Sequence, residues 1–240
     1  MNILGVIPAR RGSKGMPRKN VVDLMGKPLI SYMIEAALKS QLISRLIVST
    51  DCLEFARIAE SCGAEVPFIR PKELAQDHIS AIYVIQHALK YFDEKLFKPD
   101  YLVSLQPTSP LVSPKDIDRC LQLMIESNCD SCFTMKKIEE YHPTRMYGMD
   151  DNKVILKPYT SEAHLQRQER EPVYKLDGAV IVRKRILLER FNEQDLAFGE
   201  DRRGIVVPWY RAVDINEPLD LIIVESIMNR YNWLEDEIVL

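Results

Sequence analysis

The sequence predicts an α/β fold: an open, mainly parallel sheet with helices on both faces and a small inserted arm. Short apolar runs bounded by turn residues alternate with segments whose apolar residues recur at helical spacing. The alternation stops over residues 136–176, a polar stretch that contains Pro143, Pro158 and Pro172. With 240 residues, 46% of them hydrophobic, the chain suits one domain over 1–240 with a sizeable core and an arm at about 136–176.

The first half of the chain is expected to alternate strands and helices. Apolar runs that end at turn residues predict strands over 2–9, 45–50, 66–69 and 101–106. Helices are expected between them over 28–40, 53–62 and 78–92. In the first of these, Pro28 suits the first helical position, and the apolar residues fall on one face: Leu29, Ile30, Met33, Ile34, Ala37 and Leu38.

The second half continues the pattern on both sides of the inserted arm. A helix is expected over 113–127, with Ser113 as its cap and Pro114 as its first residue. After the arm, apolar runs predict strands over 178–182, 204–208 and 210–215. A last helix is expected to begin near Glu217 and Pro218.

Composition narrows the class of protein. Lys and Arg number 32 against 35 Asp and Glu, a net charge of −3, so no overall basic excess indicates a nucleic acid partner. No apolar run approaches the roughly 18 residues that a membrane span needs, and the start lacks the layout of a signal peptide. We therefore expect a cytoplasmic protein without a membrane partner.

The five cysteines are expected to be reduced, because they form an odd set without the density of a secreted disulfide scaffold. Cys129 and Cys132 have the CxxC spacing of a redox or half-zinc site. No second CxxC accompanies them, and "DSCFTM" resembles a strand that enters a core. Free cysteine is among the most buried residue types, so a structural role is favoured.

The stretch "IPARRGSKGMPRKN" carries the strongest chemical signal. It contains Gly12, Gly15 and Ser13 and no acidic residue, together with five cations: Arg10, Arg11, Lys14, Arg18 and Lys19. A glycine-containing loop at the end of the first strand can turn backbone N–H groups toward an anion, and its cations can complete a polyphosphate site. The stretch matches neither GxxxxGK[ST] nor GxGxxG. The alternatives are a solvated basic loop and a nucleic acid contact.

The same stretch resembles the signature "IPARGGSKGIPRKNI" of the CMP-sialic acid synthetase family, also called acylneuraminate cytidylyltransferases. Further motifs resemble those of the family in the same order, over nearly the whole chain: "VSTD" (48–51), "RPKELAQDHIS" (70–80), "LQPTSPL" (105–111), "YKLDGAV" (174–180) and "VDINEPLDL" (213–221). The resemblance implies a Rossmann-like nucleotidyltransferase domain and a homodimer in which the inserted arm serves dimerisation.

The resemblance also implies an activity. Family members transfer CMP from CTP to the anomeric hydroxyl of a nonulosonic acid of the sialic, legionaminic or pseudaminic type, and release pyrophosphate. The partners implied are CTP and an acidic sugar, with Mg²⁺ as the cofactor, and the product would supply a bacterial surface glycan. Such a displacement depends on alignment and on neutralisation of developing charge more than on covalent help from the protein.

Site residues are implied by the matching motif positions. The nucleotide would be held by Arg10, Ser13, Lys14, Lys19 and Asn20 at its phosphates and ribose, and by Arg70 and Ser80, with Ser80 at the cytosine edge. The catalytic residues would be Arg10, Lys14, Lys19 and Asp214, and the metal ligands Asp214 and Asn216. The acidic sugar would be bound by Gln106, Arg145, Arg167, Tyr174 and Asp177. Arg145 and Arg170 are equally compatible with solvated pairing to Glu169 and Glu171.

Three residues depart from the family pattern. Asn216 replaces the second Asp of "DID", and its amide oxygen can coordinate a metal but adds no charge. Asp177 replaces the Asn before glycine and adds a carboxylate near the expected sugar site, and Arg11 replaces a Gly of the first motif. No histidine occupies a motif that demands a general base, so a metal-bound hydroxide or Asp214 is left for that role.

Two other functions stay open at this level. The same fold could act on an eight-carbon ulosonic acid, or on a sugar 1-phosphate with another nucleoside triphosphate. The chain could also be a non-catalytic binder of nucleotides or nucleic acid, for which Asn216 is the best argument.

Overall fold

A computed structural model describes residues 1–230 apart from 14, 139, 151–152, 159–165 and 192–195. Its main sheet has the strand order β10–β6–β9–β5–β1–β4. The strands are β1 (Ile3–Pro8), β4 (Arg45–Ser49), β5 (Tyr101–Leu105), β6 (Ser131–Ile138), β9 (Val173–Lys184) and β10 (Arg202–Val206). β1 runs parallel to β4 and β5, and β10 runs parallel to β6, whereas β9 is antiparallel to both of its neighbours. The predicted open, mainly parallel sheet is confirmed.

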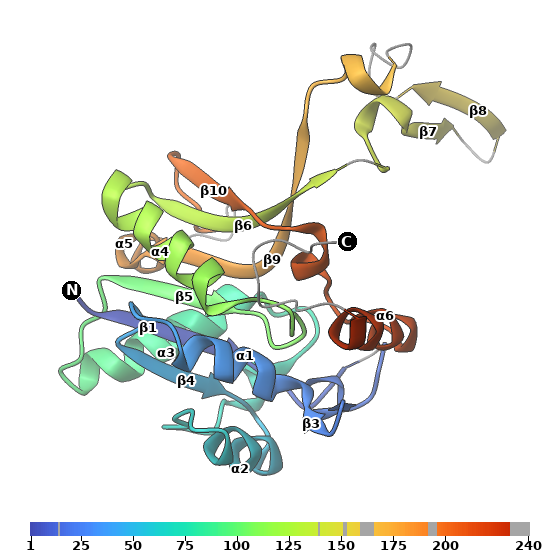
Figure 1. Cartoon of the computed structure of the whole chain (residues 1–240). Helices are drawn as coiled ribbons and strands as arrows, with labels where there is room; N and C mark the ends of the chain where they lie inside the picture. Colours follow the sequence, from blue (N-terminus) through green and yellow to red (C-terminus); the bar gives the residue numbers. More distant parts are fainter. Residues whose placement is uncertain (14, 139, 151–152, 159–165, 192–195, 231–240) are drawn as a thin grey trace.

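Helices cover both faces of this sheet (Figure 1). Alternate residues of a strand point to opposite faces, so Ile3 and Ile7 of β1 join one core cluster while Leu4 and Val6 join the other. The first cluster includes residues of α1 (Leu29–Leu38), α2 (Leu53–Ser61) and α4 (Pro114–Ser127). The second includes residues of α3 (Ala81–Glu94) and α5 (Arg185–Glu189). The predicted two-faced packing is therefore confirmed.

The starts of α4 and α1 show how well local chemistry predicts a boundary. At α4, Ser113 and Asp116 form a reciprocal capping box and Pro114 is the first helical residue, as predicted. At α1, Pro28 is the N-cap rather than the first helical residue. It belongs to an unpredicted hairpin of β2 (Asp23–Leu24) and β3 (Lys27–Pro28), whose turn places Gly26 at φ +82, a conformation that glycine adopts readily.

Two predicted strands are wrong. Residues 66–69 form no strand: Ile69 makes one isolated bridge with Thr50, just after β4, and the preceding Glu65 makes another with Ile47 of β4. Pro67 between them lacks the N–H that a ladder requires. Residues 210–215 begin in the short 3₁₀ helix η5 (Trp209–Ala212) and then continue as an irregular segment. This turn accompanies an ion pair between Arg211 and Asp116 at 3.3 Å, in which each side chain is only 1% exposed.

The last helix begins where the sequence indicates. α6 (Pro218–Arg230) follows a turn in which the Asp220 carboxylate accepts hydrogen bonds from the N–H groups of Asn216, at 2.7 Å, and Glu217, at 2.9 Å. Cys129 and Cys132 are buried free thiols in the first core cluster, as predicted for structural cysteines. In the part of the chain that is described, no helix is both long and apolar enough to cross a bilayer.

The segment between β6 and β9 extends away from the sheet, close to the predicted limits of the arm (Figure 1). The outer halves of these strands pair with each other, from Met135 opposite Leu176 to Ile138 opposite Val173. Beyond them lie η3 (Pro143–Arg145), the hairpin of β7 (Tyr147–Asp150) and β8 (Lys153–Pro158), and η4 (Arg167–Glu169). At the base of the arm, His142 is buried, and its Nε2 lies 2.9 Å from the carbonyl oxygen of Glu171.

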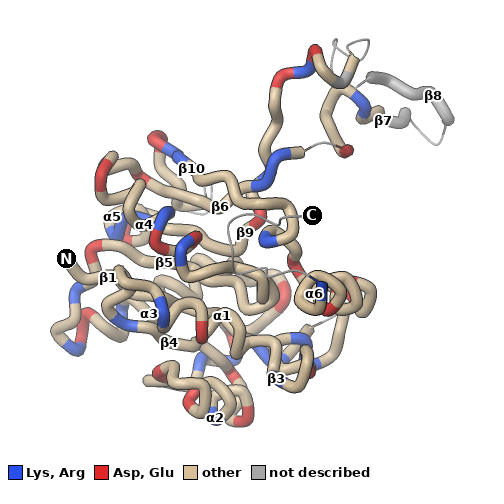
Figure 2. The backbone as a smooth tube through the Cα atoms, viewed as in Figure 1, with Lys and Arg blue, Asp and Glu red and all other residues tan. Residues whose placement is uncertain are grey.

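Charge is distributed without a single dominant sign. Basic and acidic residues are interspersed along the tube in Figure 2, in agreement with the net charge of −3. The cationic loop after β1 is therefore a local concentration, as the sequence indicates.

Candidate functional site

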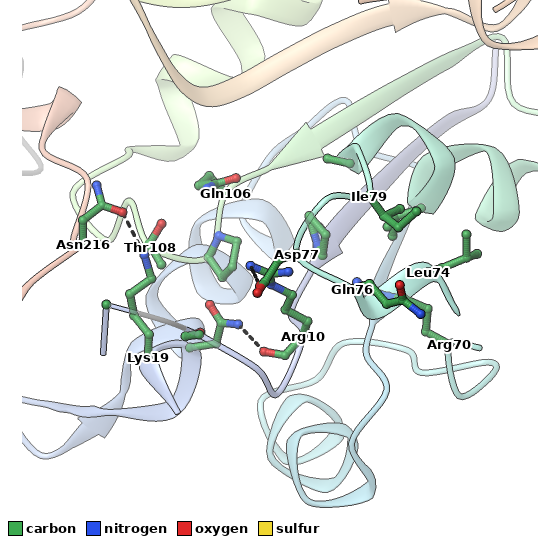
Figure 3. Close-up of a pocket in the computed structure, with 17 residues that line it drawn as sticks. Arg10, Lys19, Arg70, Leu74, Gln76, Asp77, Ile79, Gln106, Thr108 and Asn216 are labelled. Carbon is green, nitrogen blue, oxygen red and sulfur yellow. Dashed lines mark hydrogen bonds and ion pairs between the residues drawn. The ribbon is translucent and has the colours of Figure 1, made fainter. Parts of the chain in front are cut away.

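A cavity of about 450 Å³ lies at the carboxyl ends of β1 and β5 (Figure 3). In open α/β sheets ligands gather at this edge, because the loops that follow parallel strands meet there. Its lining comes from the loop after β1, the segment from Arg70 to Val84, the end of β5 and the turn before α6. Seven of the predicted site residues line it: Arg10, Ser13, Lys19, Asn20, Arg70, Gln106 and Asn216.

Arg10 projects into the cavity and meets a carboxylate there. Its Nη2 lies 2.8 Å from Oδ1 of Asp77, and the two side chains are 32% and 42% exposed (Figure 3). The buried Asn20 donates from Nδ2 to the carbonyl oxygen of Arg10 at 2.9 Å, which fixes the backbone of the loop. Asp77 was not among the predicted site residues, although "RPKELAQDHIS" contains it. A partly exposed ion pair of this kind can exchange for another anion.

Lys19 belongs to a chain of hydrogen bonds at the other side of the cavity. Its Nζ donates to Oδ1 of Asn216 at 2.9 Å (Figure 3), and Nδ2 of Asn216 donates to Oδ2 of Asp214 at 2.8 Å. The hydroxyl of Thr108 donates to Oδ1 of the same aspartate. Thr108, buried in the "LQPTSPL" motif, is a contact that the sequence analysis missed. Asp214 itself is not among the residues that line the cavity.

Arg70 supplies a buried positive charge to the cavity wall. Its side chain is 4% exposed, and Nε donates to the hydroxyl of Ser49 at 3.1 Å while Nη2 donates to the Ser49 carbonyl. Burial lowers the pKa of Arg70 to about 10, so the guanidinium keeps its charge near neutral pH. Ser49, at the end of β4 in the "VSTD" motif, is a second residue that the sequence analysis did not assign to the site.

Ser80 has a local structural task at the start of a helix. It is the N-cap of α3, and its hydroxyl accepts a hydrogen bond from the N–H of Ile82 at 3.3 Å. Its neighbours Ile79 and Ala81 line the cavity, and with Leu74 and Val84 they form an apolar wall. Ser80 is not among the described lining residues, so its predicted contact with a base stays a prediction.

The other residues expected to bind the sugar lie outside this cavity. Arg145 is exposed in η3 of the arm, and Tyr174, 45% exposed, lies on the outer part of β9. Asp177 of β9 is partly buried, and its Oδ1 accepts from the hydroxyl of Thr134 and, at 2.9 Å, from the N–H of Ala179. Burial raises the pKa of Asp177, and its Oδ2 is buried without a hydrogen-bond partner among the described residues. Lys14 and the side chain of Arg167 lie outside the described residues.

Asp214 and Asn216 offer side-chain oxygens next to Lys19, and Asn216 lines the cavity. Within the described residues, no group of three or more His, Cys, Asp or Glu side chains is placed to hold a metal ion. A single carboxylate nevertheless fits Mg²⁺, which commonly takes one or two carboxylates and completes its shell with substrate phosphates and water. Among the described residues, the oxygens of Asp214 accept from the uncharged donors Thr108 and Asn216, and no cation is paired with this carboxylate.

Comparison with known proteins adds an independent finding. The profile of a family described as "Cytidylyltransferase" matches residues 4–194. Pseudaminic acid cytidylyltransferase from Campylobacter jejuni subsp. jejuni serotype O:2 is 31% identical, with 92% of this chain and 94% of that protein covered. CMP-N,N'-diacetyllegionaminic acid synthase from Legionella pneumophila subsp. pneumophila is also 31% identical, with 95% and 97% covered.

A solved structure supports the fold. CMP:2-keto-3-deoxy-manno-octonic acid synthetase complexed with CTP has a TM-score of 0.72 and 20% sequence identity, and the match covers 96% of this chain and 99% of that chain. At this identity the likeness establishes a shared architecture, which agrees with the predicted Rossmann-like sheet.

Proposed function

This chain belongs to the cytidylyltransferase family, and we propose that it transfers CMP from CTP to the anomeric hydroxyl of a nonulosonic acid and releases pyrophosphate. The family predicted from the sequence motifs is confirmed by the profile match over residues 4–194. The observation that carries the proposal is the cavity that collects Arg10, Lys19 and Arg70 from separate segments of the chain.

The cavity suits a nucleoside triphosphate in charge and in shape. Arg10 and Lys19 provide cations for the phosphates, and charge on the departing pyrophosphate is stabilised by such preorganised groups. For Arg10 to bind a phosphate, it exchanges the Asp77 carboxylate for a phosphate oxygen. The apolar wall formed by Leu74, Ile79 and Val84 offers a surface for the base, and Arg70 adds a buried donor beside it. Lys14, Ser13 and Asn20 keep their predicted roles in this proposal.

We further propose Mg²⁺ as the cofactor, held through Asp214. Asp214 would hold the ion, which would supply positive charge to offset the charge of the triphosphate. Thr108 orients Asp214 through its hydroxyl, and Lys19 keeps a separate positive charge on the cavity side. The chain thereby aligns the triphosphate for displacement at the α-phosphorus without a covalent intermediate.

The acidic sugar is proposed from the relatives, whose names specify pseudaminic and legionaminic acids. Gln106, at the end of β5, is the predicted sugar residue that lines the cavity. Arg145, Arg167, Tyr174 and Asp177 lie toward the arm, and an arginine there is suited to grip the sugar carboxylate through parallel N–H bonds.

The separation between these residues and the cavity supports a homodimer whose arms help to complete the sugar sites. The arm exposes large apolar side chains: Tyr141, Met146 and Tyr147. Exposed clusters of such residues mark surfaces that bind a partner. Sedimentation equilibrium is expected to give twice the 27.7 kDa chain mass, and a variant with Tyr141, Met146 and Tyr147 replaced by Ser is expected to shift toward the monomer. We place the enzyme in the cytoplasm, where CTP is supplied, and its product in surface-glycan synthesis.

The direct test measures pyrophosphate release from CTP and Mg²⁺ with sialic, legionaminic and pseudaminic acids. We expect turnover with at least one of these sugars, and much less with ATP, GTP or UTP. An eight-carbon ulosonic acid and a sugar 1-phosphate serve as the alternative acceptors. Turnover with only those acceptors would redirect the substrate assignment. CTP binding without turnover on any acceptor would favour the non-catalytic alternative.

A further inference from the structure

Asn216 lies between a cation and a carboxylate and hydrogen-bonds to both. Its Oδ1 accepts from Nζ of Lys19 at 2.9 Å, and its Nδ2 donates to Oδ2 of Asp214 at 2.8 Å. Asp214 is held on its other oxygen by the Thr108 hydroxyl. The amide thus connects the loop after β1 to Thr108, just after β5, through a continuous set of hydrogen bonds, of which Figure 3 shows the one from Lys19.

The backbone of Asn216 is fixed by several neighbours. Its N–H donates to Asp220 at 2.7 Å, and the N–H of the buried Ile215 donates to the carbonyl oxygen of Thr108 at 2.9 Å. A Cβ atom added at Gly15 would lie 2.9 Å from the carbonyl oxygen of Asn216, so the cationic loop passes directly against this turn. The fold therefore brings the amide into line with Lys19 and Asp214 without a ligand.

The chemistry of an amide matters at this position. An amide donates and accepts at the same time, which satisfies Asp214 and Lys19 together. A carboxylate at 216 could accept from Lys19 but could not donate to Asp214, and two like charges would then face each other. A carboxylate would also pair with Lys19 and reduce the positive charge that Lys19 presents to a phosphate.

We propose that Asn216 is a positioning residue that aims Lys19 at the triphosphate and orients Asp214, and that it is not itself a metal ligand. This inference rests on the proposed function and revises the ligand role expected for Asn216 from the family pattern. Of the pair at 214 and 216, Asp214 alone supplies a carboxylate to the cation.

The test compares Asn216→Ala, which removes both hydrogen bonds, with Asn216→Asp, which keeps the acceptor for Lys19, removes the donor to Asp214 and adds a negative charge. Glu217→Gln, at the exposed neighbouring position, is the matched control. Mn²⁺ is titrated into the protein without CTP and free Mn²⁺ is measured by electron paramagnetic resonance. CTP affinity is measured by calorimetry, kcat and KM by pyrophosphate release, and folding by thermal melting.

For Asn216→Ala we expect CTP Kd and KM to rise about 10-fold, because a hydrogen bond to the charged Lys19 is lost, while kcat changes less. Mn²⁺ affinity is expected to stay within about twofold, since no ligand is removed. For Asn216→Asp we expect Mn²⁺ to bind about 10-fold more tightly, because a second carboxylate is added, and CTP to bind more weakly than to the wild type, because the new carboxylate pairs with Lys19 and reduces the positive charge available to the phosphates.

A folded Asn216→Ala variant that loses Mn²⁺ affinity about 10-fold would overturn the inference, because Asn216 would then be a metal ligand. Unchanged CTP affinity in that variant would overturn it as well. The Mn²⁺ titration decides between ligand and positioning residue without any turnover, whereas a wild-type protein that fails to bind CTP would contradict the proposed function itself.

Discussion

The nucleotide cavity and the arm side of the molecule are built in different ways. At the cavity, residues from four separate segments line one space and hydrogen-bond to one another, as Lys19 does with Asn216. On the arm side, Arg145 and Tyr174 are exposed on the arm and on the strand that leads to it, and Asp177 of the same strand is partly buried. The difference teaches that one chain suffices to bring together the cations proposed for the triphosphate, whereas the residues proposed for the sugar depend on where the arm is placed.

The largest expected effect concerns the stability of the sheet domain, through the buried ion pair of Asp116 with Arg211. Asp116→Ala leaves the guanidinium of Arg211 buried without its carboxylate and also removes the capping box of α4. The loss in free energy of unfolding is expected to be about 3–5 kcal/mol, measured by urea denaturation. The double variant Asp116→Leu, Arg211→Met is expected to recover much of it. Equal destabilisation in the double variant would show that the pair is not the source of the loss.

Lys19→Ala is expected to damage the nucleotide side most. Loss of a preorganised cation next to the phosphates should lower kcat/KM for CTP by about 10²–10³-fold. Steady-state pyrophosphate release measures this, with the exposed Lys90→Ala of α3 as the control. Equal effects of the two lysine variants would break the assignment of the cavity to the triphosphate.

On the arm side, Arg167→Ala is expected to act on the sugar alone. Loss of hydrogen bonds to a carboxylate should raise the KM for the sugar about 10-fold, while the KM for CTP stays within about twofold. The exposed Arg190→Ala of the same charge is the control. If the KM for CTP and the KM for the sugar rise together, the proposed separation between nucleotide binding and sugar binding is wrong.

Asp177→Asn is expected to give the smallest effect, a change in the free energy of unfolding that depends on pH. Because burial raises the pKa of Asp177 above its ordinary 3.8, the native protein holds this proton more tightly than the unfolded chain does. The contribution of Asp177 to the free energy of unfolding is fully present below about pH 3.8. It is lost as the pH rises through the pKa that Asp177 has in the folded protein. Asparagine can keep the bonds from Thr134 and Ala179, so the variant should be more stable than the wild type at neutral pH and nearly equal in acid.

Urea denaturation at several pH values measures this difference. A stability gap that does not change between acid and neutral pH would contradict a burial cost at Asp177.

Local sequence signals predicted most of the scaffold and seven of the residues that line the cavity. Periodicity located the helices, and Ser113 with Pro114 located the start of α4, because capping is decided by neighbouring residues. The predicted strand at 210–215 is wrong because its alternation of apolar residues competes with the distant ion pair of Arg211 with Asp116. No local pattern contains that partner.

The missed site residues have the same explanation. Asp77, Thr108 and Ser49 lie in the quoted motifs, but their partners Arg10, Asp214 and Arg70 are distant along the chain. The sequence identified which segments carry chemistry, whereas the pairing between them required the three-dimensional arrangement. For Asp77, the sequence did offer one signal, because this carboxylate stands within a motif that resembles the family's.

The most direct measurement of the central claim is a crystal structure of the protein grown with CTP and Mg²⁺. We predict that the triphosphate occupies the cavity at the ends of β1 and β5, with phosphate oxygens in hydrogen-bond distance of Arg10 and Lys19 and with Asp77 released from Arg10. CTP bound at another surface, with the Arg10–Asp77 pair intact, would contradict the claim.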